Sequence, residues 1–294
     1  MDSATQQPHG SLKRLYQQLK AFEPNHPSQD DLDRLGIQVS QVATVNDGII
    51  LFDPCFFRPH PDRLLQYPLN PDPEENGKPP RLRLVPTFDE ILEDCQEEYS
   101  DPEEVQLAVE SQIKVLQDLE FDKDWYMQGL SVHDCIEWQL SASRIHPEIS
   151  RLWDLGGQKY FSPSYKEGDP ALWSCWSKSW KVEDILRYST KGTFRPHTIM
   201  SCISDFAAHD TDQGLTTHEL EAIVNAMLTR MLALSFLGPQ KGRIIQAVYD
   251  GKSLTLQHSQ LWTFEGPQTA PVEMFVRYNL AQPVGLEMST LCIR

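Results

Sequence analysis

The sequence predicts an α+β fold in which an antiparallel three-stranded meander, at about residues 231–262, is flanked by helices. Two observations carry this prediction. Two turn-forming segments divide the run into three apolar stretches, and a helix signal stands on each side of it. The chain shows no β-α-β repeat, so a doubly wound parallel sheet is not predicted. The first half of the chain is predicted to be rich in acidic helices.

Each connection of the meander has its own turn signal. The first, Gly238-Pro239-Gln240-Lys241-Gly242, contains the residues that a hairpin loop needs. The second, Asp250-Gly251, is typical of a type I′ hairpin turn, because both central positions of that turn need positive φ. We therefore expect positive φ at Gly251.

A helix is predicted on each side of the meander. The pattern Thr216-Thr217-His218-Glu219 is a capping box, and it predicts a helix that runs to about Arg230. Glu221 is expected on the exposed face of this helix, and the side chains expected to face the sheet are Leu220, Ile223 and Met227. A last helix is predicted to begin at Pro271, with Met274, Phe275, Tyr278 and Leu280 in it.

Residues 1–30 are predicted to form a polar N-terminal segment, and residues 31–294 a single α+β domain. Within the first segment, residues 12–19 are compatible with a short amphipathic helix. Residues 37–52 predict two strands around the hairpin signal Asn46-Asp47-Gly48. A proline-rich stretch at about 68–80 is the best candidate for a surface loop.

Residues 89–124 contain fourteen Asp and Glu residues against two lysines. Asp101-Pro102-Glu103-Glu104 predicts a helix start, with Asp as the cap and Pro at the first helical position. Val105, Val109, Ile113 and Leu116 then recur at helical spacing. The pattern predicts a helix with one buried stripe, and a solvated acidic face accounts for its charge without any function.

The formal net charge of −16 disfavours nucleic acid as a partner, because lysine and arginine must neutralise its phosphates. DNA binding is therefore not expected, whereas cationic ligands suit an acidic field. No run of 18 apolar residues is present, so no membrane association is expected. Six scattered cysteines without a CxxC pair indicate reduced thiols, which agrees with a cytoplasmic location. No oligomeric state is predicted.

The densest ionisable cluster is the segment from Asp205 to Asp212. Asp205 and His209 stand four residues apart and would share a helix face, a spacing that suits a carboxylate orienting an imidazole. We assign both to catalysis and Asp210 and Asp212 to substrate binding. The alternative is a polar turn ahead of the capped helix, for which aspartate is a good residue.

Arg243, in the meander, is assigned the third catalytic role, in which it holds an anionic or carbonyl oxygen. Pairing of Arg243 with Asp250 or Glu219 at the surface, where an ion pair contributes little, is the alternative. Tyr249 and Asp250 of the same strand and turn are assigned to substrate binding.

Two further groups have a structural and a functional interpretation. Trp173, Trp176 and Trp180 recur at helical spacing; Trp173 and Trp176 are assigned to an aromatic wall for a flat or cationic ligand, with core packing as the alternative. His133 and Glu137 also stand four residues apart, around Cys135, for which a buried structural thiol is the favoured interpretation.

The sequence contains no GxSxG, HExxH, paired CxxC, GxGxxG or P-loop motif. Serine hydrolase chemistry and common zinc sites therefore have no support, and neither a metal nor a cofactor is predicted.

The segment from Ser235 to Gly251, with Leu261-Trp262-Thr263-Phe264 after it, resembles a motif of uncharacterised filamentous-fungal proteins, SFxGPxxGRIxQAxxDG. Asn46-Asp47-Gly48-Ile49-Ile50-Leu51-Phe52-Asp53-Pro54 is similar to the same group. The resemblance covers about a fifth of the chain. It implies specialised metabolism, where arginine-containing cyclodipeptide synthases, which use aminoacyl-tRNA, are one class. No catalytic motif of that class matches positions here.

The leading functional hypothesis is an amide-forming transferase of fungal specialised metabolism that acts on a cationic or aromatic amino-acid-derived substrate. The substrate is a small molecule or an aminoacyl group, and a tRNA-linked form is disfavoured by the net charge. The rival is a non-catalytic acidic binding or scaffold protein that meets a basic partner. A degenerate nuclease-like core is a third alternative, but the acidic-x-Lys signature is absent from its third strand.

Overall fold

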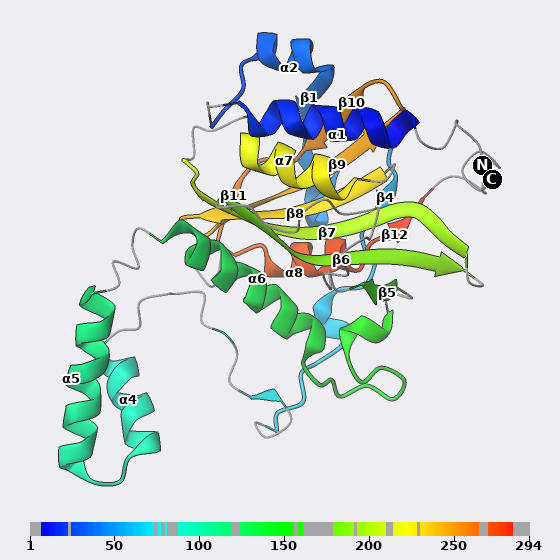
Figure 1. Ribbon diagram of the computed structural model, residues 1–294. Helices are drawn as coiled ribbons and strands as arrows, with labels where there is room; N and C mark the ends of the chain where they lie inside the picture. Colours follow the sequence, from blue (N-terminus) through cyan, green and yellow to red (C-terminus); the bar gives the residue numbers. More distant parts are fainter. Residues whose placement is uncertain are drawn as a thin grey trace.

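A seven-strand mixed sheet, covered by helices on both faces, organises the molecule (Figure 1). The computed structural model describes residues 7–22, 25–72, 76–77, 80, 88–118, 124–155, 158–161, 179–190, 193–209, 214–227, 230–264 and 270–284. The helices are α1 (Gln7–Lys20), α2 (Gln29–Leu35), α4 (Phe88–Glu98), α5 (Pro102–Asp118), α6 (Trp125–Ser141), α7 (Thr217–Ala226) and α8 (Val272–Asn279).

The main sheet runs in the order β1 (Ile37–Gln41), β10 (Leu254–His258), β9 (Lys241–Tyr249), β8 (Arg230–Gly238), β7 (Thr193–Ala207), β6 (Trp180–Thr190) and β5 (Gln158–Phe161). The short strand β11 (Trp262–Thr263) pairs with β9 outside this order. Two small antiparallel pairs join β2 (Thr44–Val45) to β3 (Ile49–Ile50) and β4 (Phe57–Arg58) to β12 (Gln282–Pro283). The α+β class is therefore confirmed, with a larger sheet than the sequence predicted.

The predicted meander is confirmed as β8, β9 and β10, whose two strand pairs are both antiparallel. Its second turn differs from the prediction. Tyr249 pairs with Leu254, so four residues form the loop, and only Gly251 has positive φ, at 97°. The Asp250 carboxylate accepts hydrogen bonds from the backbone N–H groups of Lys252 and Ser253. A side chain, and not a type I′ turn, therefore organises this connection.

Strands β6 and β7 extend the meander in a way that the sequence analysis did not predict. β7 runs parallel to β8, and α7 crosses between them, so the chain does contain one β-α-β unit. The interior segments of both strands are buried on both faces and lack the apolar–polar alternation by which a half-exposed strand is recognised.

The predicted helices beside the meander are both present, but α7 ends at Ala226 and not at about Arg230, which is the first residue of β8. The two helices lie on opposite faces of the sheet (Figure 1). Helices α1 and α7 cover one face, and α6 and α8 cover the other. The expected exposure of Glu221 is wrong: its side chain is buried and accepts a hydrogen bond from Trp180 Nε1 at 2.8 Å. α1 adds a third layer above α7, which explains why no face of α7 is left to solvent.

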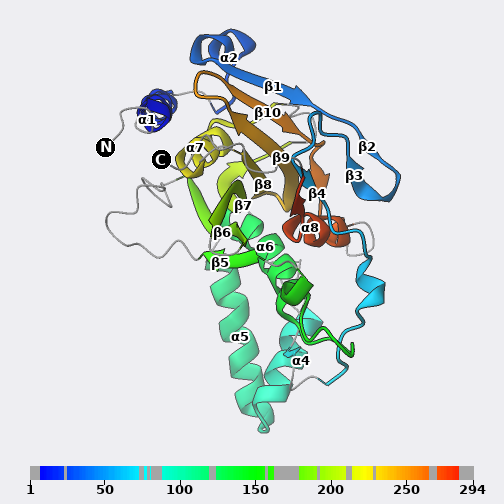
Figure 2. The same ribbon diagram turned by 90° about the vertical axis from the view of Figure 1, so that its right-hand side faces the viewer.

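The N-terminal half supplies two separate structures. β1 pairs with β10 at the edge of the sheet, and the predicted Asn46-Asp47-Gly48 turn joins the two-residue strands β2 and β3. Helices α4 and α5 form a hairpin that projects away from the sheet in both ribbon views (Figures 1 and 2). The predicted start at Asp101 is confirmed, because α5 begins at Pro102 and Asp101 Oδ1 accepts from the Glu103 N–H.

No helix within the described ranges is both long and apolar enough to span a bilayer.

Candidate active site between helix α6 and strand β6

An irregularity in β6 turns two consecutive carboxylates toward helix α6. Val182 pairs with Cys202, but the next pair joins Asp184 to Ser201, so the register shifts by one residue between them. Val182 packs in the core on the α7 side, and regular alternation would place Asp184 there too. The bulge reverses its direction, and Asp184 contacts α6 instead.

Helix α6 brings a histidine and a glutamate to this carboxylate. His133 Nε2 lies 2.7 Å from Asp184 Oδ2, and both side chains are buried. Glu137 follows one turn later on the same face of the helix. The potential ligand atoms of the three residues all lie within 4.8 Å of one another. Glu137 Oε1 is buried and has no hydrogen-bond partner among the residues that the structure describes.

The charges in this trio perturb one another strongly. Burial by itself lowers the pKa of His133, but hydrogen bonds to Asp134 and Asp184 outweigh burial and raise the pKa to about 10. Burial, followed by repulsion from Asp184, raises the pKa of Glu137 to about 7. At neutral pH the site therefore contains an imidazolium–aspartate pair beside a carboxyl that is close to half ionised.

A second polar group extends along the same seam between α6 and β6. Glu183, which precedes Asp184, accepts a hydrogen bond from Tyr126 Oη at 2.8 Å and pairs with Lys181 Nζ at 2.8 Å. Burial and the bond to Glu183 raise the pKa of Tyr126, so its hydroxyl stays protonated. The seam thus presents a phenol, an ammonium and several carboxylates side by side.

Close packing fixes the distance between α6 and the sheet. Gly129, one turn before His133, lies so near β7 that an added Cβ would stand 2.8 Å from Ile203 Cγ2. The backbone of Phe236 would be 3.4 Å away. Only glycine allows this approach, and the short distance keeps His133 within hydrogen-bonding range of Asp184.

Of the predicted catalytic residues, Asp205 and His209 lie at the end of β7 and just beyond it, both exposed. They do not sit on a helix. Asp205 instead contributes to the electrostatic environment of His218, in the first turn of α7. The ring of Phe206, the residue after Asp205, contacts the His218 ring, and the two ring centroids lie 6.2 Å apart.

Arg243, the third predicted catalytic residue, is only 1% exposed, unlike Asp205 and His209. Its Nε and one terminal nitrogen donate to the two carboxylate oxygens of Glu219 at 2.8 and 2.9 Å. The other terminal nitrogen donates to the Gly214 carbonyl at 2.9 Å. The guanidinium is therefore engaged by α7 and the loop before it.

Two of the six predicted substrate-binding residues, Tyr249 and Asp250, lie within the described part of the chain. Tyr249 is buried in β9, and Asp250 caps the exposed turn after that strand. Asp210, Asp212, Trp173 and Trp176 lie outside the described residues. The third tryptophan of that group, Trp180, is buried in β6 on the α7 face, where it packs in the core.

The sequence indicated two of the three residues of the α6–β6 trio. The spacing of His133 and Glu137 already placed them on one helix face, but nothing in the sequence connected them with Asp184, which is 51 positions from His133. Cys135, between them, has a pKa raised by burial to about 11 and is therefore no thiolate nucleophile. The structural interpretation of this thiol agrees with its burial.

The mixed nitrogen and oxygen ligand set of the trio could also hold a divalent ion. Binding would require His133 to lose its proton and to exchange its bond with Asp184 for a bond to the metal. Tight packing around His133, including the edge-on ring of Phe236 at 5.7 Å between centroids, restricts such a rearrangement.

Comparisons with protein-family models, with curated proteins and with solved structures find no match for this chain.

Proposed function

We propose that this chain is an amide-forming enzyme whose α6–β6 seam binds a cationic, amino-acid-derived substrate and transfers its protons. The observation that carries the proposal is the buried oxygen of Glu137, which lacks a hydrogen-bond partner within the described part of the chain and lies beside the pair of His133 and Asp184. A native protein retains a buried, unsatisfied carboxylate at a cost in stability, and such groups occur most often where function needs them.

The charge of the seam favours a cation as the ligand. Glu137, Asp184 and Glu183 supply three carboxyl groups, against one imidazolium and one ammonium. A substrate ammonium or guanidinium would complete the hydrogen bonding of Glu137 and relieve its repulsion from Asp184.

Proton transfer at this site suits amide formation. An amino acid offers its nitrogen as an ammonium, which has no lone pair and cannot attack an acyl group until a base removes one proton. Glu137, with a pKa of about 7, can take that proton at neutral pH. The nitrogen then attacks the activated acyl group, and the protonated carboxyl gives its proton to the departing alkoxide. The second proton, which the attacking nitrogen loses as the acyl–oxygen bond breaks and the amide forms, passes to the freed Glu137 carboxylate and from there to solvent. Asp184 and His133 hold their positions by their mutual ion pair.

Metabolite analysis of a host that expresses the chain tests this proposal. With isotope-labelled arginine in the medium, we expect a new cyclic dipeptide that carries the label, and at least about a hundredfold less of it with Glu137→Gln, in line with loss of a general base. Glu148→Gln, an exposed substitution of the same type, is the control. An unchanged metabolite profile together with a co-purified protein would support a scaffold function instead.

A divalent-cation site is the second candidate, favoured by the 4.8 Å cluster of nitrogen and oxygen atoms. The order α6, β5, β6, β7, α7, β8 also agrees with the nuclease-like core considered from the sequence. Calorimetric titration with Mg²⁺ and Mn²⁺ separates the two candidates. Saturable binding that Asp184→Asn abolishes would support the metal site, whereas metal-independent product formation would exclude a need for it.

A further inference from the structure

The α4–α5 hairpin is a structure of its own outside the main sheet. Its two helices pack on each other through four buried side chains, Ile91, Cys95, Val105 and Val109. In both ribbon views the hairpin extends away from the sheet and its covering helices (Figures 1 and 2). Two antiparallel helices bury only one narrow stripe each, so a hairpin of this kind commonly needs a third element to complete its core.

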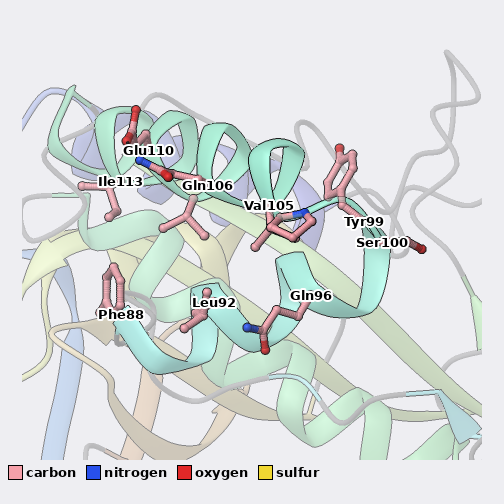
Figure 3. Close-up of a pocket in the computed structure, with 11 residues that line it drawn as sticks. Phe88, Leu92, Gln96, Tyr99, Ser100, Val105, Gln106, Glu110 and Ile113 are labelled. Carbon is pink, nitrogen blue, oxygen red and sulfur yellow. Dashed lines mark hydrogen bonds between the residues drawn. The ribbon is translucent and has the colours of Figure 1, made fainter.

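A groove of about 680 Å³ opens between the two helices. Figure 3 shows Phe88 and Leu92 of α4 facing Val105 and Ile113 of α5 across it. Phe88 is 57% exposed, although it lines an apolar surface. Exposed aromatic side chains of this kind mark protein interaction sites when they belong to a continuous apolar surface.

The hairpin that carries this groove is strongly acidic, although Glu110 is the one acidic residue among the described side chains that line the groove itself. Residues 88–118 contain eleven Asp and Glu residues and a single lysine, and therefore account for most of the net charge of −16. Gln96, Gln106 and Glu110 line the edge of the groove itself. An apolar groove on an acidic hairpin is complementary to a helix that has one apolar stripe between basic faces.

We propose that the α4–α5 groove binds a basic amphipathic helix of a partner protein, which docks as the third helix of a small bundle. The inference is independent of the function proposed for the α6–β6 seam. Leucine-type side chains of the partner fill the space between Phe88 and Ile113, and its lysines and arginines lie near Glu110 and the other carboxylates of the hairpin.

The charge of the hairpin favours a basic helix in the groove over a nucleic acid, a membrane surface or a second copy of the chain. Nucleic acids and anionic membrane surfaces are negatively charged. The hairpin has eleven carboxylates and a single lysine, so it would repel both of them. A second copy of the chain would bring the same acidic hairpin against this one, so like charges would oppose its docking.

Fluorescence anisotropy with the full-length chain tests the proposal. The probe is a labelled helical peptide with leucines at i, i+3, i+4 and i+7 and lysines at the remaining positions. We expect saturable binding that weakens as salt rises. A matched peptide with glutamates in place of the lysines should bind at least tenfold more weakly, and a basic peptide with scrambled leucine positions should also lose affinity. Equal binding of all three peptides, or of none, would overturn the proposal.

Two matched substitutions locate the binding surface. Phe88 lines the groove, whereas Leu107, 67% exposed on α5, does not. Phe88→Ser should weaken binding of the basic peptide at least tenfold, and Leu107→Ser less than twofold, with unchanged helical circular dichroism for both variants. Equal losses in the two variants would contradict the assignment. Light scattering provides a further check: a dimer that Phe88→Ser dissociates would mean that a second copy, and not a basic helix, covers the groove.

Discussion

Arg243 of β9 and Glu219 of α7 form a buried, bidentate ion pair, with distances of 2.8 and 2.9 Å between their nitrogen and oxygen atoms. The same glutamate closes the capping box of α7, because its Oε2 accepts from the backbone N–H of Thr216 at 2.8 Å. Burial favours the neutral form of Glu219, but Arg243 and the hydrogen bonds hold its pKa below the ordinary value. The pair therefore joins the start of α7 to the centre of the sheet.

Removing one charge of this pair should be far more damaging than removing both. Glu219→Gln keeps a hydrogen-bonding side chain but leaves Arg243 buried without a counter-charge, and we expect a loss of about 3–5 kcal/mol in the free energy of unfolding. The double variant Glu219→Leu/Arg243→Met should lose less than Glu219→Gln alone. Urea denaturation measures both. Near-equal losses would show that the ion pair does not govern stability here.

The stability advantage of Glu137→Gln over the wild type should grow as pH rises. The folded protein raises the pKa of Glu137 from 4.5 to about 7, so its contribution to stability is fully present below about pH 4.5 and is lost as pH rises through 7. Glu137→Gln, which stays neutral, should therefore exceed the wild type at pH 8 by up to about 3 kcal/mol and by much less at pH 5. Thermal denaturation of both proteins at the two pH values measures the difference in stability. The same difference at pH 5 and pH 8 would contradict the raised pKa of Glu137.

Asp184→Asn should both destabilise the protein and change the titration of His133. The substitution removes the counter-charge of a buried imidazolium, and we expect a loss of about 3 kcal/mol. Asp134→Asn is the control, because the Asp134 side chain is half exposed and its Oδ1 lies 3.5 Å from His133 Nδ1. This variant should lose less than about 1 kcal/mol in the free energy of unfolding. Proton NMR of the His133 ring should show protonation through neutral pH in the wild type and a much lower pKa in Asp184→Asn.

Gly129→Ala should push α6 away from the sheet. The new Cβ would meet Ile203 Cγ2 at 2.8 Å, and overpacking of this kind costs about 1–3 kcal/mol. Ile203→Ala removes the opposing methyl group, so the double variant should lose less stability than the sum of the two single variants. Strict additivity would mean that the two residues do not press on each other. The product yield of Gly129→Ala should also fall if α6 positions the site.

Gly251→Ala should cost about 1 kcal/mol through backbone strain alone. Gly251 has φ of 97°, and an added Cβ would meet no atom within 4 Å, so no clash contributes. Gly214→Ala is the matched control, because its surroundings are equally open and its φ is not in the positive region. A melting temperature of Gly251→Ala equal to that of the control would contradict the strain.

Local chemistry in the sequence determined the elements whose signals lie within a few residues of one another. The capping box at Thr216, the start of α5 at Pro102 and the three strands of the meander all depend on neighbouring side chains, and the structure contains each of them. The sequence predicted the position of the turn at Asp250 correctly but its type wrongly. The Asp250 side chain caps the turn, and this cap competes with the type I′ backbone turn that Asp-Gly favours.

Tertiary structure decided the candidate site, because its parts are brought together by long-range pairing. A one-residue bulge in β6 determines which face Asp184 occupies, and hydrophobic periodicity carries no signal for a bulge in a strand buried on both sides. The engagement of Arg243 by Glu219 likewise depends on the crossover of α7 over the sheet. Sequence alone placed His133 and Glu137 on one helix face; only the folded sheet supplied the aspartate that makes them a site.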